Sequence, residues 1–297
     1  MELSVNNLSK QIMHTQIFHD VHFNWQPGEI IGLVGQNGAG KTTLMRTLVH
    51  QYVPDSGAVL IDDKDTVEHP KMRQNIIFID PTTTFFGRYT LRQLAEFYAI
   101  AYPRFDRPRY NQLLKDYHLS PFKHYSELSK GYRALIVVFL SLCVNTPFVI
   151  LDEPFDGLDL FVREAIVNLV IGETANGSRG FLIASHNLIE LDGIADRILF
   201  LRHETISHDY TLESIREHAV KLQLVFPQHT IPDVIHDHGQ IITIQGRVIE
   251  ALFKTYTPEI EAELKALKPV LMEPLPVTLT DIFRTEFNHQ ERNAIYE

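Results

Sequence analysis

The chain has 297 residues, enough for about two ordinary domains with buried cores, so a peptide-sized scaffold is excluded. Its 27 basic and 37 acidic side chains give a formal charge of −10, and no Lys/Arg-rich block interrupts that background, so no nucleic-acid partner is expected. Hydrophobic residues at 44% and charged residues at 22% are ordinary for a folded globular chain. The single cysteine, Cys143, excludes a disulfide framework and fits a reducing, cytosolic compartment.

The first residues, Met-Glu-Leu-Ser-Val-Asn-Asn, lack the basic and apolar regions of a signal peptide, so secretion is not expected. An uncharged run at residues 134–151 reaches the minimum length of a membrane span, but an Asn-Thr-Pro turn interrupts it. The run therefore predicts a helix that ends near Val144, followed by a turn and a buried strand.

Short apolar runs alternate with helical patterns along the first two thirds of the chain, which is typical of an α/β protein. Val21, Phe23 and Trp25 alternate with polar residues and predict a half-exposed antiparallel strand. Four later runs lack polar alternation and predict buried strands of a parallel core: residues 30–34, 76–79, 148–151 and 181–184. The expected sheet core is therefore mixed.

A long helical region separates the second and third of these core strands. Helical patterns at residues 91–101 and 110–117 are part of it, and the whole region is too long for one crossover helix. We therefore expect an inserted helical subdomain at about residues 85–145.

The character of the chain changes again after Leu201. Alternation at residues 220–226, an apolar run at 241–244 and a helical pattern at 258–268 predict a separate small α/β domain. The domain organisation expected from these patterns is residues 1–215 for the first domain and 216–297 for the second.

A complete G-x-x-x-x-G-K-[ST] motif, Gly-Gln-Asn-Gly-Ala-Gly-Lys-Thr-Thr, begins at Gly35, after a predicted strand and before a predicted helix. Such a loop points backbone N–H groups at phosphate oxygens, and the positive end of the helix favours the same charge. Lys41 is expected to contact the β- and γ-phosphates, and the Thr42 hydroxyl to bind Mg²⁺. The alternative is a glycine-rich turn that binds nothing, which the strand and helix around the motif disfavour. The candidate nucleotide contacts are Asn37, Gly38, Ala39, Gly40, Lys41, Thr42 and Thr43.

Two acidic residues, Asp152 and Glu153, end the predicted strand at residues 148–151. Ligands of open α/β sheets lie at the carboxyl ends of the strands, where these carboxylates are expected. Asp152 is suited to hold Mg²⁺, and Glu153 to accept a proton from the water that attacks the γ-phosphate. Without the phosphate loop, the pair would be read as a solvated strand end.

Three further short motifs accompany the phosphate loop and the two acids: Leu-Ser-Lys-Gly-Tyr at 128–132, Gly-Leu-Asp at 157–159 and Ser-His at 185–186. With these five motifs in this order, the sequence over roughly residues 1–215 resembles the nucleotide-binding subunit of ATP-binding cassette (ABC) transporters. The three further motifs resemble that family's signature loop, D-loop and switch histidine, respectively. The resemblance implies a P-loop NTPase fold of the ABC type, with ATP and Mg²⁺ as cofactors.

The resemblance also assigns roles to residues outside the phosphate loop. Ser129 and Gly131 are expected to contact the ATP of a partner subunit, in trans, at the start of a helix. Asp159 is expected near the nucleotide, and His186 is expected to bond the γ-phosphate and to orient the attacking water and Glu153. Alone, a Ser-His pair would be read as a helix cap and a surface histidine.

The sequence departs from the commonest family pattern in three places, the first of which involves two residues. Lys130 and Tyr132 replace the usual Gly and Gln of the signature, a variant associated with exporter-type members. Ile12 stands where an adenine-stacking aromatic is expected, so Met13 or Phe18 are alternatives. The Gln expected after the strand at 76–79 is absent, and Asp80-Pro81 takes its place, which makes Asp80 a tentative Mg²⁺ ligand. Near the C-terminus, Thr-Leu-Thr-Asp-Ile-Phe at 278–283 resembles a segment that ends many exporter-type cassettes.

The resemblance implies an ATP-hydrolysing subunit that powers export through separate type 2 transmembrane subunits. In that family each ATP lies between the phosphate loop of one subunit and the signature loop of its partner, so one loop of each kind per chain implies a dimer, either a homodimer or a heterodimer with another ABC ATPase subunit. The expected location is peripheral, on the cytoplasmic face of the cell membrane. The alternative is a soluble ABC ATPase that acts on ribosomes or nucleic acid, which the negative charge disfavours. A phosphate-loop kinase would leave the signature loop and His186 unexplained.

Overall fold

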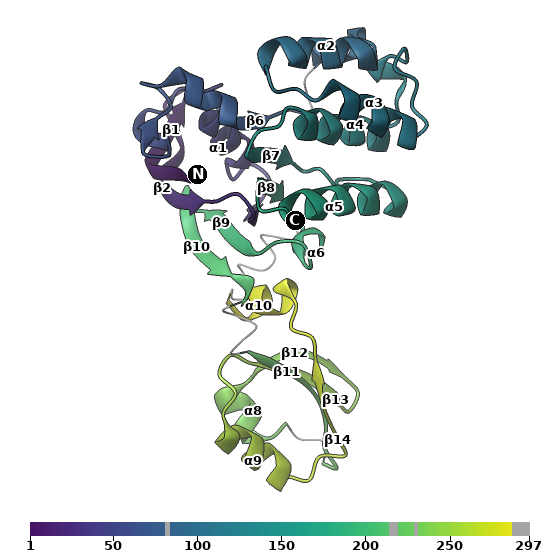
Figure 1. Cartoon of the computed structure of the whole chain (residues 1–297). Coiled ribbons are helices and arrows are strands. Elements are labelled where there is room, and N and C mark those ends of the chain that lie inside the picture. The colour runs from purple at the N-terminus through teal and green to yellow at the C-terminus, as the bar shows by residue number, and fades with distance from the viewer. Residues whose placement is uncertain (81–83, 214–218, 229–230, 287–297) are drawn as a thin grey trace. The chain divides into compact units, whose positions relative to one another are not determined.

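The computed structural model describes residues 1–80, 84–213, 219–228 and 231–286. The chain divides into two compact units (Figure 1). The larger unit comprises residues 1–186 and 194–209, and the smaller comprises residues 187–193 together with the chain from Tyr210 onward. Within the described residues, no helix is both long and apolar enough to cross a membrane.

A six-stranded sheet in the order β10-β9-β3-β8-β7-β6 forms the centre of the larger unit. Strand β3 is parallel to β8 and β9, and β7 is parallel to β6 and β8, so the predicted parallel core is confirmed. Every residue of β3 and of β8 is buried, which explains why these strands show no polar alternation. The strands are β3 (Ile30–Val34), β6 (Ile76–Phe78), β7 (Phe148–Asp152), β8 (Gly180–Ser185), β9 (Arg197–Arg202) and β10 (Thr205–Thr211).

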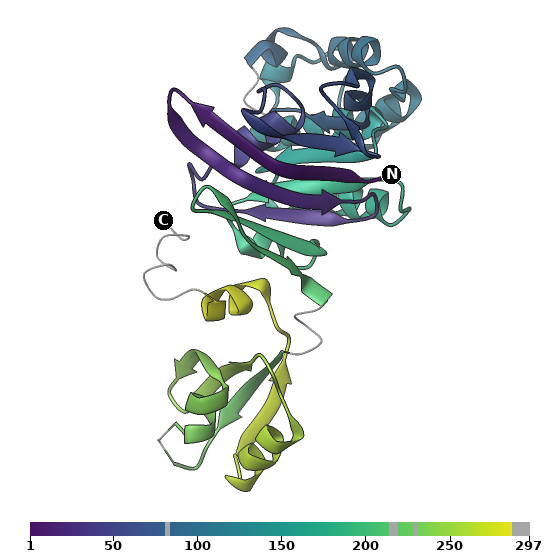
Figure 2. The ribbon, with the colours of Figure 1, turned by 90° about the vertical axis from the view of Figure 1, so that its left-hand side faces the viewer.

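A second, antiparallel sheet has the order β2-β1-β4-β5 and confirms the mixed architecture. Its two longest strands form the hairpin that Figure 2 shows in purple. Apolar side chains of both sheets and of α1 share one core, in which the Trp25 and Phe148 rings lie 4.8 Å apart. The elements are β1 (Leu3–Ile12), β2 (Thr15–Trp25), α1 (Lys41–Leu48), β4 (Ser56–Ile61) and β5 (Lys64–Asp65).

The helical insertion lies between β6 and β7, as the sequence predicts. Helix α2 has the predicted bounds and begins with a capping box formed by Thr90 and Gln93. Helix α4 ends at Cys143 and β7 begins at Phe148, so the uncharged run is a helix, a turn and a strand. The helical elements of the insertion are the 3-10 turns η2 (Thr84–Arg88) and η3 (Tyr125–Glu127) and the helices α2 (Leu91–Ala101), α3 (Arg107–Asp116) and α4 (Lys130–Cys143). Another 3-10 turn, η1 (Pro70–Asn75), precedes β6. After β7, the chain forms α5 (Leu160–Thr174) and, after β8, α6 (Leu188–Leu191).

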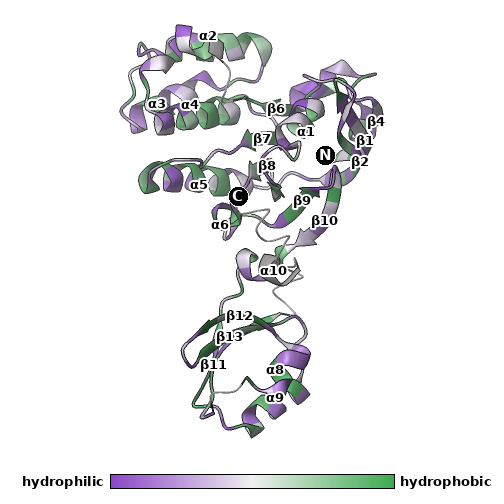
Figure 3. Ribbon diagram, turned by 180° about the vertical axis from the view of Figure 1, so that it is seen from behind, coloured by the Kyte–Doolittle hydropathy of each residue, from purple (hydrophilic) through white to green (hydrophobic). Residues whose placement is uncertain are grey.

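The smaller unit contains a four-stranded antiparallel sheet in the order β12-β13-β11-β14. Chain order β-α-β-β-α-β with this strand order is a split βαβ arrangement. Helix α9 is amphipathic, with purple and green alternating along it in Figure 3, because Ile260 and Leu264 are buried and Glu263 is exposed. The elements are β11 (Val220–Val225), α8 (Asp233–His238), β12 (Gln240–Gln245), β13 (Val248–Phe253), α9 (Pro258–Ala266), β14 (Leu271–Leu275) and α10 (Leu279–Glu286).

The C-terminal segment that resembles the end of exporter-type cassettes forms the start of α10. The carboxylate of Asp281 accepts hydrogen bonds from the backbone N–H and the hydroxyl of Thr278, and its two oxygens lie 3.1 and 3.2 Å from Lys221 Nζ. Glu250 also pairs with Lys221, at 3.1 Å. Asp281 is thus a structural residue of the smaller unit, whereas the side chain of Phe283 lies outside the described residues.

Candidate functional site

The phosphate loop connects β3 to α1, as the motif predicts. Gly38 and Gly40 have φ of 83° and 100°, a conformation that glycine adopts readily. A Cβ at Gly40 would also lie 2.9 Å from Cγ2 of Ile17, so the loop has no room for a side chain there. The glycines therefore allow both the turn and the close approach of β2.

Lys41, the first residue of α1, is buried and points back into its own loop. Its ammonium donates hydrogen bonds to the carbonyl oxygens of Gly35 (2.5 Å) and Gln36 (3.2 Å) and lies 3.6 Å from Glu153 Oε1. Burial lowers the pKa of Lys41, and the nearby carboxylates of Glu153 and Asp152 act in the opposite direction. Lys41 is thus held where a phosphate would replace carbonyl and carboxylate oxygens as its partner.

Thr42 and Asp152 come together as the sequence predicts for two Mg²⁺ ligands. The Thr42 hydroxyl donates a hydrogen bond of 2.7 Å to Asp152 Oδ2. Burial raises the pKa of Asp152, and the charge of Glu153 raises it further, while the bond from Thr42 lowers it. A hydroxyl beside a partly buried carboxylate is a set of hard oxygen donors that fits Mg²⁺.

Glu153 and His186 meet across two neighbouring strands, because β7 pairs with β8 through Asp152 and Ala184. The Nδ1 of His186 lies 2.9 Å from Glu153 Oε2, and the His186 backbone N–H donates to the same oxygen at 3.3 Å. The Glu153 backbone N–H donates to Ala184 O, and Glu153 has a φ of 46°. The left-handed backbone of a non-glycine residue at this position is a feature typical of functional sites.

Asp80, the third predicted metal ligand, forms an ion pair with Arg46 of α1. Its charge nevertheless contributes to the raised pKa of Asp152, so the two carboxylates are close enough to interact. Arg46 also bonds the hydroxyl of Tyr52 at 2.9 Å. Sequence analysis missed Arg46, although its position one helical turn after Thr42 places it on the same face of α1 and was a usable signal.

The signature loop and the D-loop lie beside one another in the same chain. Ser129 caps α4 by accepting a bond from the Tyr132 backbone N–H, and Asp159 caps α5 by accepting one from Val162. A Cβ at Gly131 would lie 3.4 Å from Val162. These contacts place both helix N-termini at one edge of the unit.

Lys130 makes a specific contact that sequence analysis did not predict. Its ammonium lies 2.6 Å from Asp156 Oδ2, and this hydrogen bond lowers the pKa of Asp156. Gly157 has a φ of 64°, and a Cβ there would lie 2.8 Å from Lys130 Nζ. The variant signature residue thus has a partner in the chain segment between Glu153 and the D-loop.

The region expected to hold adenine is the turn between β1 and β2. Ile12 pairs with Thr15 across this hairpin, and Met13 in the turn is 92% exposed. Phe18 is fully buried in the core, so the expectation that it might stack on the base is wrong: the apolar core takes its ring. Ile17, which lies against Gly40, is a contact to the loop that sequence analysis missed.

The family model described as "ABC transporter" matches residues 18–156. The chain is 31% identical to the ABC transporter ATP-binding protein YtrB of Bacillus subtilis over 290 residues, which is 98% of this chain and 99% of that protein. It is 28% identical to the lipopolysaccharide export system ATP-binding protein LptB of Escherichia coli and 27% identical to the sulfate/thiosulfate import ATP-binding protein CysA of Synechocystis, over 74% and 73% of this chain and 95% and 63% of those proteins.

Solved structures agree on the fold. A structure described as the ATP binding subunit of an ABC transporter matches with a TM-score of 0.66 and 26% identity, over 73% of this chain and 92% of the other. The phosphate loop, the paired acids and the switch histidine meet at one sheet edge within this fold. The chain belongs to the ATP-binding subunits of ABC transporters and is an ATPase of that family.

Proposed function

We propose that this chain hydrolyses ATP to power export through separate membrane-spanning subunits. The observation that carries the catalytic part is the position of Glu153, whose two oxygens reach Lys41 on one side and His186 on the other. The name of LptB, an export system protein, and the variant signature with Lys130 support the direction. The name of CysA, an import protein, is the reason to test that direction.

The residues of the site divide the work of ATP hydrolysis. Loop residues 37–43 bind the phosphates, with Lys41 exchanging its present oxygen partners for those of the β- and γ-phosphates. Thr42 and Asp152 would hold Mg²⁺, which would supply positive charge to the phosphates when bound. Asp80 remains a candidate third ligand if its pair with Arg46 opens.

Glu153 accepts the proton of the attacking water, and His186 holds the Glu153 carboxylate and the γ-phosphate in position. The hydrogen bond between His186 and Glu153 supports this pairing of roles. Asp159 caps α5 and thereby holds the D-loop.

The complete site requires a second subunit. In the proposed dimer, Ser129 and Gly131 of one chain contact the ATP on the phosphate loop of the other, so two-fold symmetry completes both sites. The partner is a second copy of this chain or another ABC ATPase subunit. The dimer would bind permease subunits and lie on the cytoplasmic face of the membrane.

Affinity purification of the tagged chain from detergent-solubilised cells tests this function. A partner with several hydrophobic spans, and ATPase activity in the purified complex, are expected. Co-purification of ribosomes or nucleic acid without such a partner would favour the soluble alternative. Inside-out vesicles expose the cytoplasmic face, so uptake of substrate by such vesicles on addition of external ATP would establish export. No uptake there, together with uptake by right-side-out vesicles loaded with ATP, would establish import.

A further inference from the structure

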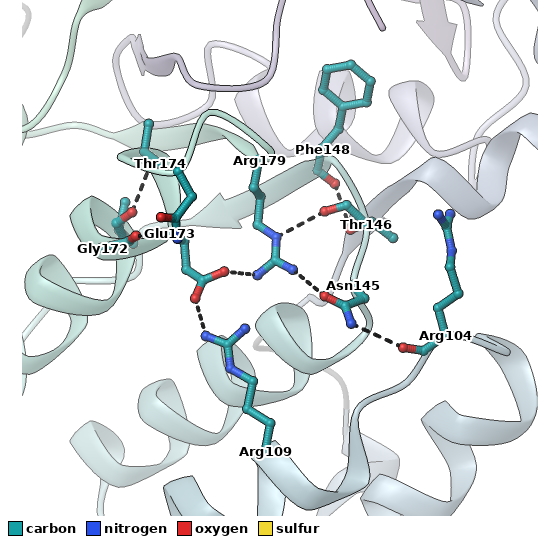
Figure 4. Close-up of polar contacts among 11 residues, drawn as sticks. Arg104, Arg109, Asn145, Thr146, Phe148, Gly172, Glu173, Thr174 and Arg179 are labelled. Carbon is teal, nitrogen blue, oxygen red and sulfur yellow. Dashed lines mark hydrogen bonds and ion pairs between the residues drawn. The ribbon is translucent and has the colours of Figure 1, made fainter.

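A partly buried polar cluster joins the C-terminal ends of α4 and α5. The signature loop and the D-loop lie at the opposite, N-terminal ends of these two helices. At its centre, Glu173 of α5 forms ion pairs with Arg109 of α3 and with Arg179, which precedes β8 (Figure 4). Arg179 is only 5% exposed and also donates to Thr146 O (3.1 Å) and Asn145 Oδ1 (2.9 Å). Thr146 and Asn145 form the turn between α4 and β7, so one carboxylate connects the helical insertion to the central sheet.

The two arginines that pair with Glu173 differ in burial. Arg179 is almost fully buried, and burial lowers its pKa. Its buried positive charge is compensated by Glu173 and by the oxygen acceptors of Thr146 and Asn145. The Arg109 side chain is 31% exposed, and its contact with Glu173 links α3 to α5. A backbone bond from the Asp106 N–H, at the N-cap of α3, to Cys143 O (2.7 Å) also ties α3 to the end of α4. Loss of the Arg109 contact would therefore leave the Glu173–Arg179 pair in place.

We propose that Glu173 and Arg109 are positioning residues that set the orientation of the signature loop for the partner's ATP. Helix α4 has 14 residues and is about 20 Å long, with Ser129 at its N-cap and the cluster just beyond its C-terminus. A rotation of a few degrees at the cluster moves the signature loop by about 1 to 2 Å, which is enough to weaken hydrogen bonds to a phosphate. Helix α5 ends in the same cluster and begins at Asp159, so the D-loop shares this reference point.

The inference rests on the proposed sandwich of ATP between two subunits, and Arg109→Met is the variant that tests it. The control is Arg92→Met, because Arg92 pairs only four residues away with Glu96 on the surface of α2 and joins no other element by that pair. In the Glu153→Gln background, Arg109→Met should raise the ATP concentration needed for dimerisation about five-fold or more, with ATP affinity of the single subunit unchanged. Arg109→Lys, which keeps a cation, should restore part of the loss.

Hydrogen exchange in the single subunit provides a readout that does not depend on dimerisation. Arg109→Met should speed exchange of the amides at residues 133–136, the first turn of α4 whose N–H groups have intrahelical acceptors, and Arg92→Met should not. If Glu153→Gln alone fails to dimerise with ATP, the sandwich is wrong, and the exchange result still decides the inference. Unchanged exchange at residues 133–136, or dimerisation equal to that of the background, would overturn it.

Discussion

Both units of the chain hold a lysine between carboxylates, yet only one of these lysines lies in a candidate active site. Lys41 is buried and lies 3.6 Å from Glu153, with Asp152 nearby, whereas Lys221 is partly buried and lies 3.1 Å from both Glu250 and Asp281. The charges are the same in kind and number. A lysine between two acids is therefore no guide to function by itself.

The surroundings of the two lysines make the difference. Lys221 extends from an antiparallel strand, and its partner Asp281 also accepts two hydrogen bonds from Thr278. The charged groups of this cluster therefore have partners within the smaller unit. Lys41 starts a helix after a glycine loop, at the carboxyl edge of parallel strands, and its partners are backbone carbonyls and an acid that also bonds His186. The partners of Lys41 are oxygen atoms that a phosphate can replace, as expected of a binding site. The partners of Lys221 are carboxylates of the smaller unit, as expected of a structural cluster.

The largest expected effect is on ATP turnover, and it concerns Glu153, the acid that has no functional counterpart in the Lys221 cluster. Glu153→Gln should lower ATP turnover by about 10² to 10⁴ while ATP still binds, because an amide of the same size cannot accept the proton. Dimers should accumulate with ATP, as measured by size exclusion. Glu263→Gln, at an exposed position of α9, is the control and should hydrolyse ATP at the parental rate. Parental turnover by Glu153→Gln would shift the role of base to another group.

Removal of the lysine in the larger unit should affect ligand binding. Lys41→Ala should weaken ATP binding by about a hundredfold, because the β- and γ-phosphates lose their buried cation. Titration calorimetry measures the change, and circular dichroism should show a native fold. An unchanged dissociation constant would contradict the assignment of Lys41.

Removal of the lysine in the smaller unit should affect stability instead. Lys221→Met leaves Asp281, which is 3% exposed, without its cation and should cost about 3 kcal/mol of unfolding free energy. Chemical denaturation followed by circular dichroism measures the loss, while Trp25, the single tryptophan, reports on the larger unit by fluorescence. ATP affinity should stay at the parental value. A large fall in ATP affinity would contradict the purely structural role given to Lys221.

A smaller effect is expected at the base-binding hairpin. Ile12→Tyr should tighten ATP binding by about 1 kcal/mol, roughly five-fold, because an aromatic face stacks on adenine better than an aliphatic side chain. Ile100→Tyr, the same change at an exposed position of α2, is the matched control and should change little. Equal affinities for the parent and Ile12→Tyr would mean that residue 12 does not face the base.

The smallest expected effect concerns pH and a histidine outside the site. Burial lowers the pKa of His50, and the charge of Arg73 lowers it further, so the unfolded chain binds this proton more tightly than the folded one. The contribution to stability is therefore complete above the unfolded pKa and is lost as the pH falls through the lowered pKa. His50→Asn should flatten the fall of the melting temperature between about pH 7.5 and 5.5. His118→Asn is the control, since His118 shares the left-handed backbone but is exposed.

Sequence patterns predicted elements that have a strong local signal, such as an uninterrupted apolar run or a helical period. Strands β3, β6, β7 and β8 and the turn before β7 follow from apolar runs and an Asn-Thr-Pro break, and α2 follows from a helical pattern. Strands β1, β4, β5, β9 and β10 of the larger unit and β13 and β14 of the smaller one were not predicted. In the smaller unit, β13 has consecutive buried residues at its end and β14 contains Pro274. These two strands gain their definition from pairing with β11, which no local pattern reveals.

The same contrast applies to the site. The phosphate loop, Asp152, Glu153 and His186 are adjacent to strand ends, so parallel pairing brings them together in a way that sequence order predicts. Arg46 and Asp156 were missed because their roles depend on one long-range partner each, Asp80 and Lys130. Phe18 was misjudged because an aromatic residue looks the same in sequence whether its ring fills a core or faces a ligand.

The left-handed backbone at Glu153 sets chemistry against fold stability at a single position. A residue with a Cβ is disfavoured there by about 1 to 2 kcal/mol, and glycine would relieve that strain. Glycine would also remove the proton acceptor. Selection for heat resistance alone should therefore enrich glycine at residue 153, and a gene copy released from ATP hydrolysis has a thermodynamic reason to lose this glutamate early.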